Sequence, residues 1–191
     1  MTPEDRSRIT ALAKTNDVNI AFDVFPSDIA ESGPRAEVER RLVHLDAWDA
    51  ATSPQASQQF WSGMHELGHV VLNHPPVPFY EMIIGMPSPS TLEQESEAWA
   101  WAIDNAQRPL DEAGRVTIAF AVSSYVPAVL YPGVVDSLPN TVRLMNLVGR
   151  QFPSRKSVGD AFPPALVERY FPGASGQWEQ LWRELDLASA A

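Results

Sequence analysis

The stretch "HELGH", residues 65 to 69, places His65 and His69 four residues apart, with Glu66 directly after the first histidine. On an α-helix, residues four apart lie about 40° apart around the axis and about 6 Å apart along it, so both imidazoles can reach one metal ion. Glu66 is turned by about 100° from His65 and is expected beside the ion rather than on it. There it can take a proton from an attacking water and pass it to a leaving amine.

Zinc is the metal that this arrangement favours. It lowers the pKa of a bound water to around 7 and polarises a substrate carbonyl. An H-E-x-x-H pattern arises by chance in roughly one chain of this size in two hundred, so its context matters. Gly68 supports a functional interpretation of the motif. Glycine inside a helix lowers its stability by ~1 kcal/mol relative to alanine, so its presence indicates close packing behind the site.

The third ligand can follow on the same helix or come from another one. In the metzincin pattern, H-E-x-x-H-x-x-G-x-x-H, the same helix supplies it, but Leu72 replaces the required glycine and Pro75 the required histidine. His74 is one residue out of place and precedes two prolines. We expect it at the helix end or at the rim of the site, not as a ligand. A later helix is therefore the predicted source.

The stretch "EQESEAWAWA", residues 93 to 102, offers three glutamates for this role. Ser90 and Glu93 match an S-x-x-E capping box, which would commit Glu93 to the start of the helix. Glu95 shares a face with the alanines three and seven residues further on, and these small residues would let two helices approach closely. Glu97 is turned by about 200° from Glu95, so only one of the two can point at the metal. The pattern favours Glu95, with Glu97 as the alternative.

Composition limits the remaining possibilities. The chain has 191 residues, with 14 Lys and Arg against 24 Asp and Glu, and a formal net charge of −10. We expect no direct nucleic acid binding, which needs clustered positive charge. Without cysteine, any metal must be held by nitrogen and oxygen ligands. We expect a cytoplasmic protein without membrane contact, because there is no signal peptide pattern at the start and the most apolar run is too short to cross a bilayer.

The elements that must position the motif are predicted from periodicity and from start and stop signals. A first helix is expected over residues 2 to 17, with Thr2 as its cap. Strands are expected at residues 18 to 25 and around residues 42 to 45, separated by a loop that begins with residues 26 to 35. The helix that carries the motif is predicted to start at Ser53, its cap, and to end at the two prolines after His74.

Helices also dominate the predicted second half of the chain. The second ligand helix is expected over residues 90 to 107, after a strand or extended loop at residues 78 to 90. Four further helices are predicted beyond it, at residues 110 to 131, 137 to 152, 163 to 171 and 175 to 187. We therefore expect two regions, a core at residues 1 to 108 and a helical C-terminal extension, residues 109 to 191, packed on that core.

These motifs resemble those of the ImmA/IrrE family of metallopeptidases, which pairs an H-E-L-G-H helix with a later helix of the form E-x-x-A-N-x-F-A. The segment "HELGHVVLNH" matches the first part, and "ESEAWAWA" matches the second through Glu95, Ala98 and Ala102. Trp99 and Trp101 replace the asparagine and the phenylalanine of the pattern. The resemblance spans residues 10 to 108. The family's Leu-Leu-Met-Pro-like continuation is replaced by "IDNAQRP".

The resemblance implies a zincin-like metallopeptidase domain of the α+β class, in which a small sheet can hold an extended substrate along its edge. It implies that His65, His69 and Glu95 bind Zn²⁺, as in gluzincins generally, and that Glu66 is the general base. It also implies a protein substrate, a DNA-binding repressor of a mobile element such as a phage or of a stress regulon. The alternative is a regulatory module that binds a repressor or toxin partner without cleaving it and keeps the zinc for stability.

Other polar residues invite weaker interpretations. His44 lies on a predicted strand ahead of the motif and is expected to have a structural role. A peptidase needs a group that stabilises the negative charge of its tetrahedral intermediate. Four side chains are candidates for this group: His74, Tyr80, Tyr125 and Tyr131. Trp99 and Trp101 are two residues apart on one helix, so we expect only one of them in the core.

Overall fold

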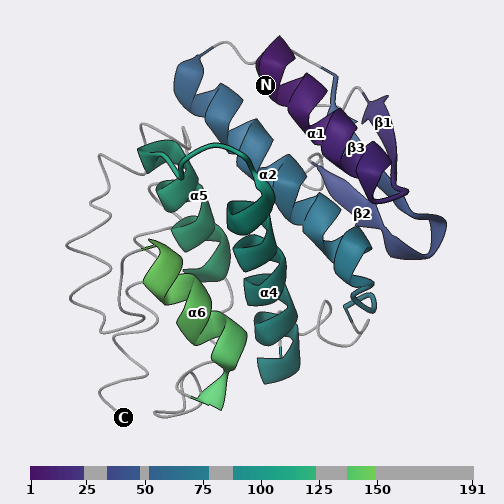
Figure 1. Cartoon of the computed structure of the whole chain (residues 1–191). Helices are drawn as coiled ribbons and strands as arrows, with labels where there is room; N and C mark the ends of the chain where they lie inside the picture. Colours follow the sequence, from purple (N-terminus) through teal and green to yellow (C-terminus); the bar gives the residue numbers. More distant parts are fainter. Residues whose placement is uncertain (24–33, 48–51, 78–87, 124–136, 149–191) are drawn as a thin grey trace, which may run out of the picture.

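The computed structural model describes residues 1–23, 34–47, 52–77, 88–123 and 137–148. Within them the protein belongs to the α+β class, with five α-helices and a sheet of three strands. The elements are α1 (Pro3–Thr15), β1 (Asn19–Asp23), β2 (Arg35–Glu37), the 3-10 helix η1 (Val38–Arg40), β3 (Leu42–Asp46), α2 (Ser53–Leu72), α4 (Pro89–Asn105), α5 (Glu112–Ser123) and α6 (Pro139–Val148). Figure 1 shows α2 at the centre, with α1 and the sheet on one side and α4, α5 and α6 on the other.

The sheet has the strand order β1-β3-β2. β3 pairs in parallel with β1 and antiparallel with β2, so that His44 lies opposite Ala21 on one side and Arg35 on the other. The strands predicted around residues 18 to 25 and 42 to 45 are confirmed for the described residues. β2 was not predicted, and its first residue falls in the expected loop. Its sequence, Arg-Ala-Glu, has little strand propensity, so its conformation depends on pairing with β3.

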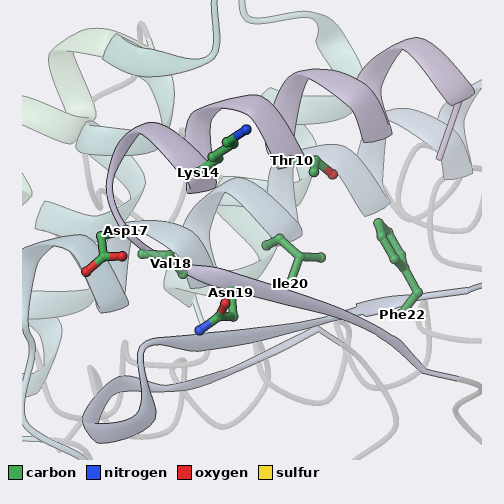
Figure 2. A pocket seen from close by; sticks show the side chains of 7 residues that line it. All are labelled: Thr10, Lys14, Asp17, Val18, Asn19, Ile20 and Phe22. Carbon is green, nitrogen blue, oxygen red and sulfur yellow. The ribbon is translucent and has the colours of Figure 1, made fainter.

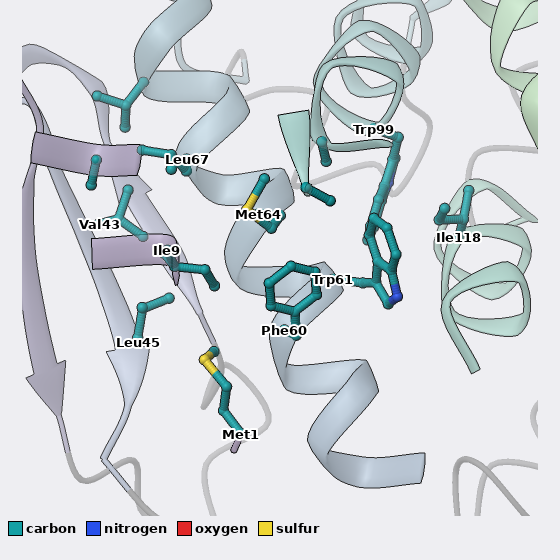
Figure 3. Packing of buried hydrophobic residues seen from close by; sticks show 14 of the residues in the cluster. Met1, Ile9, Val43, Leu45, Phe60, Trp61, Met64, Leu67, Trp99 and Ile118 are labelled. Atoms are coloured by element: carbon teal, nitrogen blue, oxygen red, sulfur yellow. The ribbon is translucent and has the colours of Figure 1, made fainter. Parts of the chain in front are cut away.

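The core lies on both sides of α2 (Figure 3). Toward the sheet and α1, the helix buries Phe60, Met64 and Leu67, which recur at helical spacing. On its other side, Trp61 lies with Trp99 of α4 and Ile118 of α5. Because both faces are covered, the position of α2 is fixed by tertiary packing rather than by helix propensity alone.

The structure corrects two predicted helix starts. α1 begins as expected, with the Thr2 hydroxyl accepting a hydrogen bond from the Asp5 amide at 3.1 Å. α2 is capped by Thr52, not by Ser53, which lies inside the helix. α4 is capped by Ser88, whose hydroxyl accepts from the Thr91 amide at 3.3 Å, not by Ser90. In each corrected case a proline follows the true cap closely and extends the helix by one or two residues at its start.

Glu93 has a different role from the predicted capping box, because it caps another helix. Its carboxylate accepts hydrogen bonds from the amides of Asn140 and Thr141, at 2.7 and 3.2 Å, in the first turn of α6. The Thr141 hydroxyl also donates to it at 3.2 Å and lies 2.9 Å from the hydroxyl of Ser96. A carboxylate at this position satisfies otherwise unpaired helix donors and favours the positive end of the helix dipole. α6 is therefore fastened to the start of α4.

Replacing Glu93 by alanine is expected to destabilise the protein by about 1.5–3 kcal/mol, the range for hydrogen bonds to a charged group. The loss should appear in the free energy of unfolding measured with urea. Glu39→Ala, at an exposed glutamate of η1, is the matched control and should change stability by less than about 0.5 kcal/mol. Equal stability of the two variants would show that Glu93 does not hold α6.

α5 is joined to the central helix through Asp111. This carboxylate accepts hydrogen bonds from the Ser57 hydroxyl, the Trp61 indole and the Gly114 amide, and it pairs with Arg108. Asp111 therefore caps α5 and also holds it against α2. The predicted helices at residues 110 to 131 and 137 to 152 are confirmed over α5 and α6. Of the strand or extended loop expected at residues 78 to 90, residues 88 to 90 instead form the cap and start of α4, and the rest lies outside the described residues. The ends of both these helices and the two last predicted helices also lie outside them.

Candidate metal centre

Three side chains from two helices converge at one point. His65 and His69 of α2 place their Nε2 atoms 3.0 Å apart. The carboxylate of Glu95, on α4, lies 3.1 Å from Nε2 of His65 and 3.4 Å from Nε2 of His69. All three side chains are at most 13% exposed. This buried group could hold a metal ion.

The two helices approach closely at Gly68. A methyl group built on this glycine would lie 2.9 Å from the carbonyl oxygen of Ala98 and 3.2 Å from the ring of Trp101. Ala98 and Ala102 are themselves fully buried. The close packing expected at Gly68 is therefore confirmed, and its nearest backbone neighbour is Ala98 of α4. This close contact brings the start of α4, and Glu95 with it, over the two histidines.

The donor set fits a small divalent cation. Zinc is bound by imidazole nitrogens and carboxylate oxygens at about 2.0–2.2 Å, which puts neighbouring ligand atoms of a tetrahedron about 3.3 Å apart. The two imidazole nitrogens are 3.0 Å apart and one carboxylate oxygen is 3.1 Å from Nε2 of His65, both close to that value, while the 3.4 Å separation from His69 involves the second carboxylate oxygen. Nitrogen and oxygen ligands without thiolate are also the set that catalytic zinc sites use together with one open position.

Without a metal, the carboxylates of Glu66 and Glu95 favour the protonated form of His65. Burial alone would lower the pKa of His65, but hydrogen bonds and charge from Glu66 and Glu95 outweigh it and raise that pKa to about 9. Burial would likewise raise the pKa of Glu95, but His65 and His69 outweigh it and hold that pKa far below its ordinary value. A cation, either a proton or a metal ion, therefore suits the centre of this group.

The metal-free protein is expected to lose stability as the pH rises from 6.5 to about 9. Below 6.5, folded and unfolded chains both hold the His65 proton, so its contribution is fully present. Between 6.5 and about 9 only the folded chain holds it, and the contribution is lost as the pH passes through the folded pKa. Melting temperatures measured with a chelator across this interval should fall. His65→Asn should flatten the dependence, and a wild-type melting temperature that rises with pH would contradict it.

Glu66 and Trp99 both contact His65. An oxygen of Glu66 lies 3.4 Å from Nδ1 of His65, on the opposite side of the ring from the ligand atom. Trp99 stacks on the same ring, with centroids 4.1 Å apart and planes at 12°. Trp99 is 2% exposed and Trp101 half-buried, so only the first lies fully in the core, as expected. Trp99 thus orients the ring of His65 by packing.

His74 lies at the end of α2, buried beside the ligand group and not part of it, as expected; its contacts with His69 and Glu97 were not predicted. Its Nδ1 lies 2.9 Å from Nδ1 of His69, and its Nε2 lies 3.2 Å from an oxygen of Glu97. Burial and the nearby His69 lower the pKa of His74. Glu97, the alternative third ligand, therefore contacts His74 and is not part of the converging group. The sequence signal for this contact was the Asn73-His74 pair at the helix end.

His44 lies in a separate group on the sheet. It pairs with Asp23 through Nδ1 and with Glu37 through Nε2, the latter at 2.7 Å. Arg40 and His44 hold the pKa of Glu37 below its usual range. These contacts tie the three strands together, in agreement with the expected structural role. Tyr80, Tyr125 and Tyr131, candidates for stabilising the intermediate, lie outside the described residues.

A pocket of about 290 Å³ lies elsewhere, between α1 and β1 (Figure 2). Lys14 and Thr10 line it from the helix, and Ile20 and Phe22 line it from the strand. It contains none of the converging ligands, so it is distinct from the candidate metal centre. Among the described helices, none has the length and apolar character needed to cross a membrane.

Comparison of this chain with protein-family models, with curated proteins and with solved structures gives no match. The fold and the converging His-His-Glu group therefore stand on the geometry described above.

Proposed function

We propose that this protein is a zinc-dependent endopeptidase with a zincin-like domain. The observation that carries the proposal is the convergence of His65, His69 and Glu95, with 3.0 to 3.4 Å between their nearest ligand atoms. Glu66, the next residue after the first of these histidines, contacts the other nitrogen of its ring. The resemblance of both helices to the ImmA/IrrE pattern supports it. A purely structural zinc site would not require a carboxylic acid next to the first histidine.

The protein's own residues would divide the work of peptide hydrolysis. Zinc, when bound, would lower the pKa of a bound water to around 7 and polarise the scissile carbonyl. His65, His69 and Glu95 are the residues that would hold the ion. Glu66, whose side chain is 20% exposed, accepts the proton of the attacking water and returns it to the nitrogen of the leaving amine. Because its oxygen lies 3.4 Å from Nδ1 of His65, on the other side of the ring from the ligand atoms, the Glu66 side chain would have to turn toward the ligand group for this step.

The proposed substrate is a regulatory protein in the cytoplasm, a DNA-binding repressor. β2 packs beside α2 and pairs with β3 on one side. Within the described part of the chain no strand pairs with its other side, so β2 forms an edge of the sheet. Such an edge offers backbone donors and acceptors to an extended peptide, which would lie near the helix that carries the histidines. The acidic chain, with a net charge of −10, suits the recognition of a basic protein more than of nucleic acid.

Glu66→Gln tests the proposal directly. The zinc-loaded protein is incubated with the transcription regulator encoded beside its gene, and the products are identified by mass spectrometry. We expect the wild type to cleave and the variant to be slower by a factor of about 10²–10⁴, the usual contribution of a general base. Zinc content should be equal, because Glu66 is not a ligand.

Two results would contradict the peptidase. Equal cleavage by wild type and Glu66→Gln would exclude Glu66 as the base. An intact regulator that forms a stable complex with both proteins would instead favour the alternative, a non-cleaving module that keeps its zinc for stability.

A further inference from the structure

We propose that His74 and Glu97 are positioning residues of the metal centre, which fix the proton of His69 on Nδ1 and so direct its Nε2 lone pair at the metal. The inference rests on the proposed metal site and goes beyond it, because neither residue touches the reacting atoms. It depends on a chain of contacts that runs outward from the ligand to the surface.

When a metal is bound, only one arrangement of protons satisfies all the contacts from His69 through His74 to Glu97. Nε2 of His69 must present a lone pair, so its single proton is on Nδ1. That proton can only be donated to Nδ1 of His74, 2.9 Å away, which must therefore be unprotonated. The proton of neutral His74 is then on Nε2, where it is donated to the Glu97 carboxylate at 3.2 Å. Glu97 thus selects one tautomer of His74, and His74 selects the metal-binding tautomer of His69.

The end of α2 builds this contact. Asn73 adopts the left-handed conformation, with φ 56° and ψ 44°, and ends the helix. The amide of His74 then donates to the carbonyl of His69 at 3.0 Å, and the amide of Asn73 donates to that of Val70 at 3.3 Å. This is the Schellman pattern, in which the last residue of the motif commonly packs on the residue five positions before it. Here the pair that meets consists of two imidazoles, with ring centroids 5.0 Å apart.

The burial of the two residues matches their proposed roles. The side chain of His74 is 7% exposed and that of Glu97 is 40% exposed. Water can therefore stabilise the charge of Glu97, while the imidazole contact stays dry and directional. Partners in a second layer usually change metal affinity by 10–100-fold, because they orient the ligand and increase its basicity.

Matched pairs of variants test this inference through zinc affinity, measured by competition with a chromophoric chelator. Glu97→Leu removes the acceptor at a partly exposed position, whereas Glu97→Gln keeps an amide oxygen that can accept from His74. His74→Phe removes the acceptor for His69, whereas His74→Gln keeps one. We expect Glu97→Leu and His74→Phe to weaken zinc binding by about 10–100-fold and the two glutamine variants to recover most of the loss.

Cobalt gives a readout that a general loss of stability would not produce. In the Co²⁺-loaded variants Glu97→Leu and His74→Phe, the visible ligand-field bands should shift, because His69 is reoriented while the number of ligands is unchanged. Melting temperatures of the metal-free variants identify any that fail to fold. Because Glu97 is partly exposed, its two variants are expected to fold even if those of the buried His74 do not.

Backbone variants give an independent check. Asn73→Gly keeps the left-handed conformation and should keep wild-type affinity, whereas Asn73→Val disfavours it and should behave like His74→Phe. Wild-type affinity and an unshifted cobalt spectrum in both Glu97→Leu and His74→Phe would overturn this inference alone. Absence of zinc binding by the wild type would overturn the metal site as well, and absence of cleavage with normal zinc binding would overturn only the peptidase.

Discussion

Replacing Gly68 by alanine is expected to abolish tight zinc binding, although residue 68 is not a ligand. The added methyl group would lie 2.9 Å from the Ala98 carbonyl oxygen and 3.3 Å from its Cα, which are backbone atoms of α4. Backbone cannot rotate away as a side chain can, so α4 must move outward or tilt. Glu95 lies one helical turn before Ala98 and would move with it. Overpacking of this kind costs about 1–3 kcal/mol in stability.

Gly63→Ala is the matched control, at the same helix. Its methyl group would meet only side-chain atoms, with the Cδ2 of Leu45 the nearest at 2.8 Å. The sheet-facing side chains can adjust, and α4 is not involved. We expect this variant to lose some stability but to bind zinc as the wild type does. Metal analysis after dialysis and chelator competition would measure both variants, and retained zinc affinity in Gly68→Ala would contradict the proposed role of the helix contact.

Glu95→Ala is expected to weaken zinc binding by a factor of about 10²–10³. Structural zinc sites with four ligands bind with roughly 10–16 kcal/mol, so one ligand corresponds to about 2.5–4 kcal/mol. The loss should be larger here than for any variant of Glu97, which contacts His74 rather than the converging nitrogens. The comparison therefore separates the two glutamates that the sequence left as alternatives.

The affinity is measured by chelator competition at a pH near 7, with circular dichroism of the metal-free variant as a control for folding. Glu95→Gln keeps the shape of the side chain and one oxygen donor but loses the charge, and it should fall between wild type and Glu95→Ala. Equal zinc content in wild type and Glu95→Ala would exclude Glu95 as a ligand.

The sequence predicted those parts of the site that depend on the geometry of a single helix. The spacing of His65 and His69, and the face that Glu95 shares with Ala98, follow from helical periodicity. Close packing at Gly68 was also predicted, because a glycine in a helix interior needs a reason. The spacings are properties of one helix, whereas the neighbour of Gly68, the backbone of Ala98, becomes known only from the fold.

The features that sequence reasoning missed depend on partners distant in the chain. Glu93 matched a local capping box, yet its carboxylate bonds to the start of α6, more than forty residues later. β2 has no strand pattern of its own and exists through pairing with β3. The role of His74 required the left-handed turn at Asn73, which a sequence suggests only weakly. In each case tertiary structure selected among several local possibilities.

The contacts of α4 have a consequence for how the two halves of the described structure communicate. Glu93 and Glu95 are two residues apart, so they lie about 200° apart around the helix. One carboxylate holds α6, and the other faces the histidines of α2. If the group binds a metal, docking of α6 and metal binding would therefore favour the same position of α4. By thermodynamic reciprocity each would then strengthen the other by an equal factor, and a partner that displaced α6 would be expected to lower the affinity for the metal.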